Sequence, residues 1–197
     1  RDAAYRGLRV VLLEMQDLAY GTSSRSSKLV HGGLRYLEKL EFSLVFEAVS
    51  ERRILMNIAP HLVNPLGFLF PVYRSSRRGV FTINLGMWVY DGLSLFRSPK
   101  IHRNLSTKQV KKEEPSLQRK GLRGAPLYYD CSTDDARLTL ETAIDAANHG
   151  AAICTYSKVT GYVRDDSGKL TGVEVEDQIT GEMRVVQGNA IINATGP

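Results

Sequence analysis

Helices are predicted in four parts of the chain, two of them from the spacing of apolar residues. Leu34 to Met56 and Asp134 to His149 carry apolar side chains three and four positions apart, which places them on one face of a helix. The first of these is either one long helix or a broken pair. Residues 2–6 have the character of a helix end, and the apolar, aromatic stretch 79–96 predicts a helix around Trp88, whose ring we expect in the core.

Other apolar runs have the pattern of strands. Leu8 to Leu13 and Ala190 to Ala194 are short, largely apolar runs, typical of buried strands. Phe68 to Phe70 is a third short run. Beyond residue 150, turn-forming residues separate further predicted strands at 151–156, 158–164, 170–176 and 182–186.

This order of elements predicts an α/β fold with an antiparallel excursion. Residues 66–132 differ in composition from the rest and have the character of an insertion. We therefore expect a discontinuous domain of residues 1–65 and 133–197, interrupted by that inserted segment. Because the chain opens on a helix end and stops just after an apolar run, we also expect it to be part of a longer protein.

The amino-acid composition is that of an ordinary globular protein. With 43% hydrophobic and 24% charged residues, the chain is neither disordered nor of low complexity, and two cysteines exclude a disulfide framework. A net charge of +5 fits an anionic ligand, a nucleic acid or a membrane surface. Eight basic residues form either a solvated surface or a contact for anionic lipid: Lys100, Arg103, Lys108, Lys111, Lys112, Arg119, Lys120 and Arg123.

Glu14 directly follows the first predicted strand. Dinucleotide-binding folds place at this point the acid that accepts hydrogen bonds from a ribose. An ordinary solvated acid at a strand end has the same pattern, so the position alone leaves both interpretations open.

A polar stretch from Gly21 to Gly33 is the strongest chemical feature of the sequence. Hydroxyls and backbone amides can donate to phosphate, cations can neutralise its charge, and glycines let the backbone approach a ligand closely. A flexible surface loop could have the same composition, but this stretch follows a strand and leads into a helix. Its polar residues are Thr22, Ser23, Ser24, Arg25, Ser26, Ser27 and Lys28, and Arg35 follows.

Residues 21–38, GTSSRSSKLVHGGLRYLE, closely resemble the signature of the FAD-dependent glycerol-3-phosphate dehydrogenases. These flavoproteins are related to the glycine and D-amino-acid oxidases. Residues 59–62, 134–138 and 193–197 extend the resemblance over the chain. It implies a Rossmann-like FAD-binding domain of the D-amino-acid/glycine oxidase type with an inserted substrate-domain segment. The family's GxGxxG motif and its C-terminal part would lie outside this sequence.

The resemblance also implies roles for individual residues. Arg35 and Tyr36 would reach the substrate, and His31 would either take a proton from it or hydrogen-bond the flavin or the backbone. Glu14 would hold the adenosine ribose, and Val159 would offer its backbone to adenine. The other residues that would contact FAD are Thr22, Ser23, Ser24, Ser26, Ser27, Lys28, Leu29, His31, Gly32, Gly33, Ala194, Thr195 and Gly196. No metal site is expected, because the histidines and cysteines lack ligand spacing.

The leading hypothesis is a flavoprotein that oxidises sn-glycerol 3-phosphate to dihydroxyacetone phosphate and passes the electrons from FAD to a quinone. The intact enzyme would be a homodimer, cytoplasmic and peripheral on the inner face of the cytoplasmic membrane, and this part alone would be inactive. One alternative is a glycerol-3-phosphate oxidase that uses oxygen. A remote alternative is a basic nucleic-acid-binding module, which would need aromatic residues interleaved with the basic ones.

Overall fold

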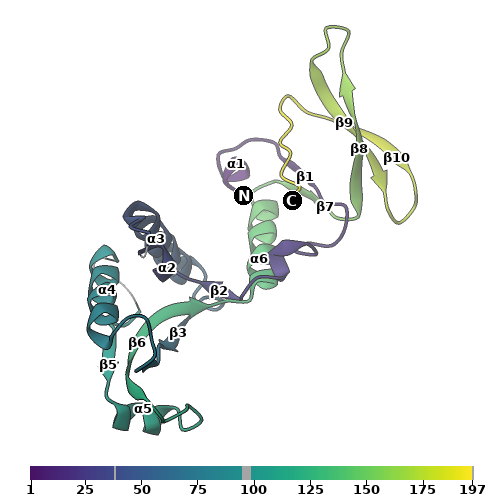
Figure 1. Ribbon diagram of the computed structural model, residues 1–197. Helices are drawn as coiled ribbons and strands as arrows, with labels where there is room; N and C mark the ends of the chain where they lie inside the picture. Colours follow the sequence, from purple (N-terminus) through teal and green to yellow (C-terminus); the bar gives the residue numbers. More distant parts are fainter. Residues whose placement is uncertain (38, 95–98, 197) are drawn as a thin grey trace. The chain divides into compact units, whose positions relative to one another are not determined.

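The computed structural model describes residues 1–37, 39–94 and 99–196, with the side chain of Arg35 outside the described part (Figure 1). The chain forms two compact units, Arg1–Ser26 with Asp135–Pro197, and Ser27–Asp134. Each unit has its own sheets and its own buried side chains, so the two are described separately.

The first unit contains a short parallel sheet beside helices. Strand β1 (Val11–Leu13) pairs in parallel with β7 (Ala152–Cys154). The long helix α6 (Asp135–Asn148) follows the expected apolar spacing, and α1 (Asp2–Tyr5) contacts it. Small side chains form the shared core and let the backbones approach closely: Ala4, Ala146 and Ala151 are buried, with Val10 and Ile153 against them.

A three-stranded meander completes this unit. Strands β8 (Ser157–Arg164), β9 (Leu170–Asp177) and β10 (Met183–Gln187) pair antiparallel in the order β10-β9-β8 (Figure 1). The predicted turn between β8 and β9 is present, and the Asp165 carboxylate accepts from the amides of Ser167 and Lys169 at 2.9 and 3.1 Å.

One strand prediction in this unit was wrong, and another was wrong in part. Residues 190–194 form no strand, and Ile192 is 86% exposed. Val11 and Leu12, expected to be buried, are 48% and 42% exposed. The exposure of Val11 and Leu12 has a physical reason: within the described residues β1 and β7 form a two-stranded sheet, which covers little of its own surface. Residues 190–194 do not pair with this sheet among the described residues.

The second unit is built around strand β6 (Leu122–Ser132), which is long and bent (Figure 1). It pairs antiparallel with four shorter segments. These are β2 (Leu29–Val30), β3 (Asn64–Leu69), β4 (Val72–Tyr73) and β5 (Arg103–Leu105). No strand was predicted over 122–132, because Gly124 and Pro126 interrupt the run and its apolar residues do not alternate cleanly.

Helices cover this sheet. The predicted helix at 34–56 is a broken pair, α2 (Leu34–Leu37) and α3 (Phe42–Ile58), separated at Leu40, whose φ is +59°. Helix α4 (Val80–Leu93) packs on α3, and Val45, Val49 and Tyr90 form their buried contact. The short helix α5 (Thr107–Glu113) packs through Val110 against Leu105 and Ala125. Trp88, expected in the core, is 52% exposed.

The compact units differ from the expected segmentation mainly at one boundary. Residues 27–65, assigned from sequence to the discontinuous domain, lie in the second unit. The reason is strand pairing: Leu29 and Val30 pair with Ser132 and Cys131, and β3 pairs with β6 along its whole length. The other boundary, expected between 132 and 133, falls after Asp134.

Candidate functional site

Glu14 lies at the carboxyl end of β1, as expected from the sequence. Its backbone continues the pairing with the neighbouring segment, since its amide donates to the Cys154 carbonyl at 2.9 Å and its carbonyl accepts from Ser157 at 2.8 Å. One carboxylate oxygen accepts from the Gln16 amide at 3.0 Å. The side chain is half-buried. A fixed, partly accessible carboxylate at this point has the chemistry to accept hydrogen bonds from a ribose.

The first residues of the polar stretch, up to Ser26, belong to the first unit. Thr22, Ser23 and Ser24 form a single 3-10 turn, η1, which contacts α6. Ser26 is tied to the start of α6, where its amide and hydroxyl donate to the Asp135 carboxylate at 3.3 and 2.6 Å. Thr22 and Ser23 have exposed side chains, whereas Ser26 also has a structural role.

Arg25 folds back on its own loop. Its guanidinium donates to the carbonyls of Tyr20 and Gly21 and lies over the Tyr20 ring, 5.3 Å from the ring centroid. The arginine therefore stabilises the loop conformation in this structure.

The continuation of the stretch belongs to the second unit. Ser27 and Lys28 are exposed, and Lys28 adopts a left-handed conformation with φ of +59°. The Lys28 carbonyl accepts from the Thr133 amide at 2.9 Å, and Leu29 opens strand β2. The backbone is thus held by β6 while these side chains face solvent.

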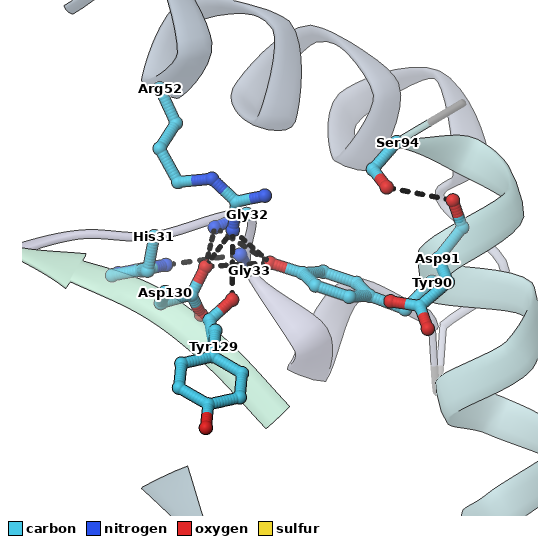
Figure 2. Close-up of polar contacts among 9 residues, drawn as sticks. All are labelled: His31, Gly32, Gly33, Arg52, Tyr90, Asp91, Ser94, Tyr129 and Asp130. Carbon is cyan, nitrogen blue, oxygen red and sulfur yellow. Dashed lines mark hydrogen bonds and ion pairs between the residues drawn. The ribbon is translucent and has the colours of Figure 1, made fainter. Parts of the chain in front are cut away.

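A buried polar cluster lies behind the next residues of the stretch, and it consists of Arg52 on α3, Tyr90 on α4 and Asp130 on β6 (Figure 2). The three side chains are 1%, 1% and 3% exposed. The Tyr90 hydroxyl donates to Asp130 Oδ1 at 2.7 Å, and Arg52 Nη1 donates to the Tyr90 hydroxyl at 3.0 Å and forms an ion pair with Asp130. The buried carboxylate is thus paired with a cation and accepts hydrogen bonds, as a buried charge requires.

This cluster binds the backbone of Gly32. The Gly32 amide lies 3.1 Å from both the Tyr90 hydroxyl and Asp130 Oδ1 (Figure 2). There is no space for a side chain here, because a Cβ on Gly32 would stand 2.2 Å from the Tyr90 hydroxyl oxygen and 2.4 Å from Val49 Cγ1. The glycine is therefore required by the close approach of Tyr90 and Val49.

Burial sets the protonation of the cluster. The pKa of the Tyr90 hydroxyl lies above its ordinary value, first because burial disfavours the phenolate and second because Asp130 is negatively charged. The hydroxyl therefore stays protonated through neutral pH and keeps donating to Asp130. Burial also raises the pKa of Tyr128, with Asp130 as the second cause.

His31 is exposed, directly beside the buried glycines. Gly33 has a φ of +65°, and its amide donates to His31 Nδ1 at 3.0 Å (Figure 2). A neutral ring that accepts at Nδ1 carries its proton on Nε2, so in this conformation it offers a donor. Proton abstraction by Nε2 would require the ring to exchange this contact.

The two predicted substrate residues follow on α2. Tyr36 packs its ring over Gly33, where a Cβ would stand 2.3 Å from Tyr36 Cδ2, and it borders the cluster of Val45, Val49 and Tyr90. The side chain of Arg35 lies outside the described part of the chain.

The remaining predicted cofactor residues lie in the first unit. Val159 is 42% exposed, and the pairing of β8 with β9 is irregular just after it, between Val159 and Gly161. Ala194, Thr195 and Gly196 are exposed, and the Thr195 amide and hydroxyl contact the Asn193 side chain at 3.2 and 2.9 Å.

Sequence reasoning missed the cluster of Arg52, Tyr90 and Asp130. A signal for Arg52 was present, because it falls on the same face of α3 as Val45 and Val49, four and then three residues further along. A charged residue on a buried stripe needs a partner. Its partners on α4 and β6, 38 and 78 residues away, could not be read from any local pattern.

Known proteins match the chain along its whole length. The family profile described as FAD dependent oxidoreductase (DAO) matches residues 1–197. Aerobic glycerol-3-phosphate dehydrogenases of Staphylococcus haemolyticus and Staphylococcus aureus are 43% and 40% identical over 196 residues. These matches cover 100% of this chain but 35% of the relatives, so the chain spans about a third of their length.

Solved structures agree with this result. The X-ray structure of the glycerol-3-phosphate dehydrogenase from Bacillus halodurans complexed with FAD matches with a TM-score of 0.74 and 33% identity, over 100% of this chain and 31% of that one. Glycine oxidase from Geobacillus kaustophilus shares the fold, with a TM-score of 0.62, 21% identity and coverage of 93% and 48%. The predicted fold class is thereby confirmed, and the chain belongs to the DAO family of FAD-dependent oxidoreductases.

Proposed function

We propose that the full-length protein oxidises sn-glycerol 3-phosphate to dihydroxyacetone phosphate with FAD as the acceptor. The observation that carries this proposal is the identity of 40–43% to aerobic glycerol-3-phosphate dehydrogenases over the whole chain. The likeness in fold to the FAD complex from Bacillus halodurans supports it.

The residues present fit the cofactor. Glu14 offers a fixed carboxylate for the ribose, and Thr22, Ser23 and Ser27 offer exposed hydroxyls for phosphate oxygens. The other cofactor contacts predicted from the resemblance, including Val159 and Ala194–Gly196, remain part of the proposal.

When bound, FAD supplies the acceptor for the hydride that leaves the alcohol carbon of the substrate. The chain supplies position and charge. The exposed Lys28 ammonium can attract the phosphate group, and His31 presents its ring from a fixed turn. In the observed conformation His31 would hold a substrate or flavin oxygen through Nε2–H, and Arg35 and Tyr36 remain the proposed substrate residues.

The test uses the full-length protein, purified without added flavin. We expect a yellow protein with the visible absorption of oxidised flavin, bleached under anaerobic conditions by sn-glycerol 3-phosphate. The enantiomer sn-glycerol 1-phosphate is the matched control. A colourless protein would disprove the cofactor, and a flavin bleached equally by both enantiomers would disprove the substrate. Rapid formation of peroxide in air would favour an oxidase.

The electron acceptor and the location extend the proposal. We take the acceptor to be a quinone and the site of action to be the inner face of the cytoplasmic membrane, with the protein a homodimer. Supporting a membrane surface, all eight basic residues between Lys100 and Arg123 have exposed side chains, and Phe81 and Trp88 on α4 are 80% and 52% exposed. None of the described helices combines the length and apolar character needed to cross a bilayer.

A further inference from the structure

We propose that Arg52, Tyr90 and Asp130 are positioning residues for this reaction, which hold the exposed imidazole of His31 by binding the Gly32 amide. The inference rests on the proposed function, because the reaction that it serves is the oxidation of the substrate by bound FAD.

Three separate elements converge on one backbone group. The Gly32 amide lies 3.1 Å from acceptors on α4 and β6, and Arg52 reaches both of those acceptors from α3. Asp130 Oδ1 thus accepts from Tyr90, Arg52 and Gly32 together. An amide held in this way cannot shift unless two buried hydrogen bonds are broken.

Because the Gly32 amide is fixed, the backbone of Gly33 and the exposed ring of His31 are fixed as well. Gly33 is fixed in a left-handed conformation between the buried Gly32 and the ring of Tyr36. Its amide donates to Nδ1 of the exposed His31 at 3.0 Å, which orients the ring (Figure 2). The exposed imidazole is therefore two hydrogen-bonded steps away from the buried carboxylate of Asp130.

The chemistry of the cluster favours positioning over simple packing. A buried ion pair with its hydrogen bonds is often no more stabilising than apolar residues of the same volume. Its bonds are directional, however, and an apolar core would not fix an amide at one point. Reactions of bound groups are sensitive to such placement, since an error of about 1 Å can lower the rate about 100-fold.

The experiment compares Asp130→Asn and Tyr90→Phe with Asp91→Asn in the full-length protein. Asp91 is a matched control: it is 2% exposed, lies next to Tyr90 on α4, and binds His102, at 2.7 Å from Oδ2 to Nδ1, instead of Gly32. In Asp130→Asn and Asp91→Asn, a carboxylate is replaced by an amide of about the same volume, so each variant loses one negative charge. Tyr90→Phe removes only a hydroxyl, so it tests the same contact in a variant expected to fold.

Three quantities are measured in each variant: the limiting rate of flavin reduction by sn-glycerol 3-phosphate, the Michaelis constant, and the visible circular dichroism of the bound, oxidised flavin. For Asp130→Asn and Tyr90→Phe we expect a rate lowered about tenfold or more, with the Michaelis constant changed less than threefold and the dichroism band altered. Asp91→Asn should keep the wild-type rate and the wild-type dichroism band, even if its thermal unfolding midpoint falls as far as that of Asp130→Asn.

The outcomes separate this inference from the proposed function. If Asp91→Asn slows the reaction as much as Asp130→Asn, or if Tyr90→Phe leaves both rate and dichroism unchanged in a yellow, active protein, the positioning role is overturned and the proposed function stands. A wild-type protein that binds no flavin would overturn both.

Discussion

Gly32 is the residue at which an exposed, polar stretch meets a buried charge. Its neighbours explain why no other residue fits, since a Cβ would stand 2.2 Å from the Tyr90 hydroxyl oxygen and 2.4 Å from Val49 Cγ1. Neither atom belongs to the freely moving end of a side chain, because Tyr90 is 1% and Val49 is 4% exposed. The added methyl group must therefore displace a packed helix or break the bonds of the cluster.

We expect Gly32→Ala to lower the free energy of unfolding by roughly 1–3 kcal/mol, the usual cost of overpacking a core. Gly21→Ala is the control, because nothing lies within 4 Å of its added Cβ and its φ is −76°. Urea denaturation of the two full-length variants measures the difference. Equal midpoints would show that Tyr90 and Val49 move aside without loss.

Helix α5 illustrates how short elements depend on their ends. Seven residues are too few for a helix that is stable alone, so its stability comes from Val110 in the core and from its first turn. Ser106 and Gln109 form a capping box, in which each side chain satisfies the backbone amide of the other residue.

Replacing Ser106 by Ala should lower the free energy of unfolding by about 1 kcal/mol, through the loss of the cap. Ser116→Ala removes a similarly exposed hydroxyl, which bonds only the nearby Glu114 at 2.5 Å among the contacts described, and should have a smaller effect. Denaturation midpoints again give the comparison. If the two serines behave alike, the capping box contributes nothing to the stability of α5.

The sequence predicted the elements that depend on local pattern. The apolar spacing located α3 and α6, the apolar and aromatic composition located α4, the turn residues located the meander, and the strand before Glu14 is present. It missed β6 and misjudged the run at 190–194, because strand formation depends on a partner elsewhere in the chain. For the site, the resemblance pointed to the exposed stretch, whereas the buried partners on α3, α4 and β6 follow only from the tertiary contacts.

For the whole molecule, the net charge of +5 is unevenly distributed. Residues 100–123 carry eight basic and two acidic side chains, and α5 alone presents Lys108, Lys111 and Lys112 to solvent. A surface of this kind attracts anionic lipid with about 1 kcal/mol per basic residue near the membrane. The proposed location at a membrane can therefore be tested by reversing charges in this segment. The control variant carries the same change in net charge at positions outside the segment.

The double variant Lys111→Glu/Lys112→Glu should bind vesicles of phosphatidylcholine and phosphatidylglycerol at least about tenfold more weakly than the wild type. Lys158→Glu/Lys169→Glu carries the same change in net charge, at exposed positions on the meander and its turn, and should bind almost as the wild type does. Sedimentation or flotation of the full-length proteins measures the bound fraction. Equal losses in both variants would show that total charge, and not the segment 100–123, governs binding.

The central place of β6 has a consequence for how the protein is made. β6 is the last strand of its unit to leave the ribosome, yet every other strand of that sheet pairs with it. Until β6 emerges, the segments from Leu29 to Leu105 have no hydrogen-bonding neighbour in the sheet, and pairing over such separations is slow. During synthesis this unit therefore passes through a period with unpaired strand edges, in which protection by a chaperone would matter most.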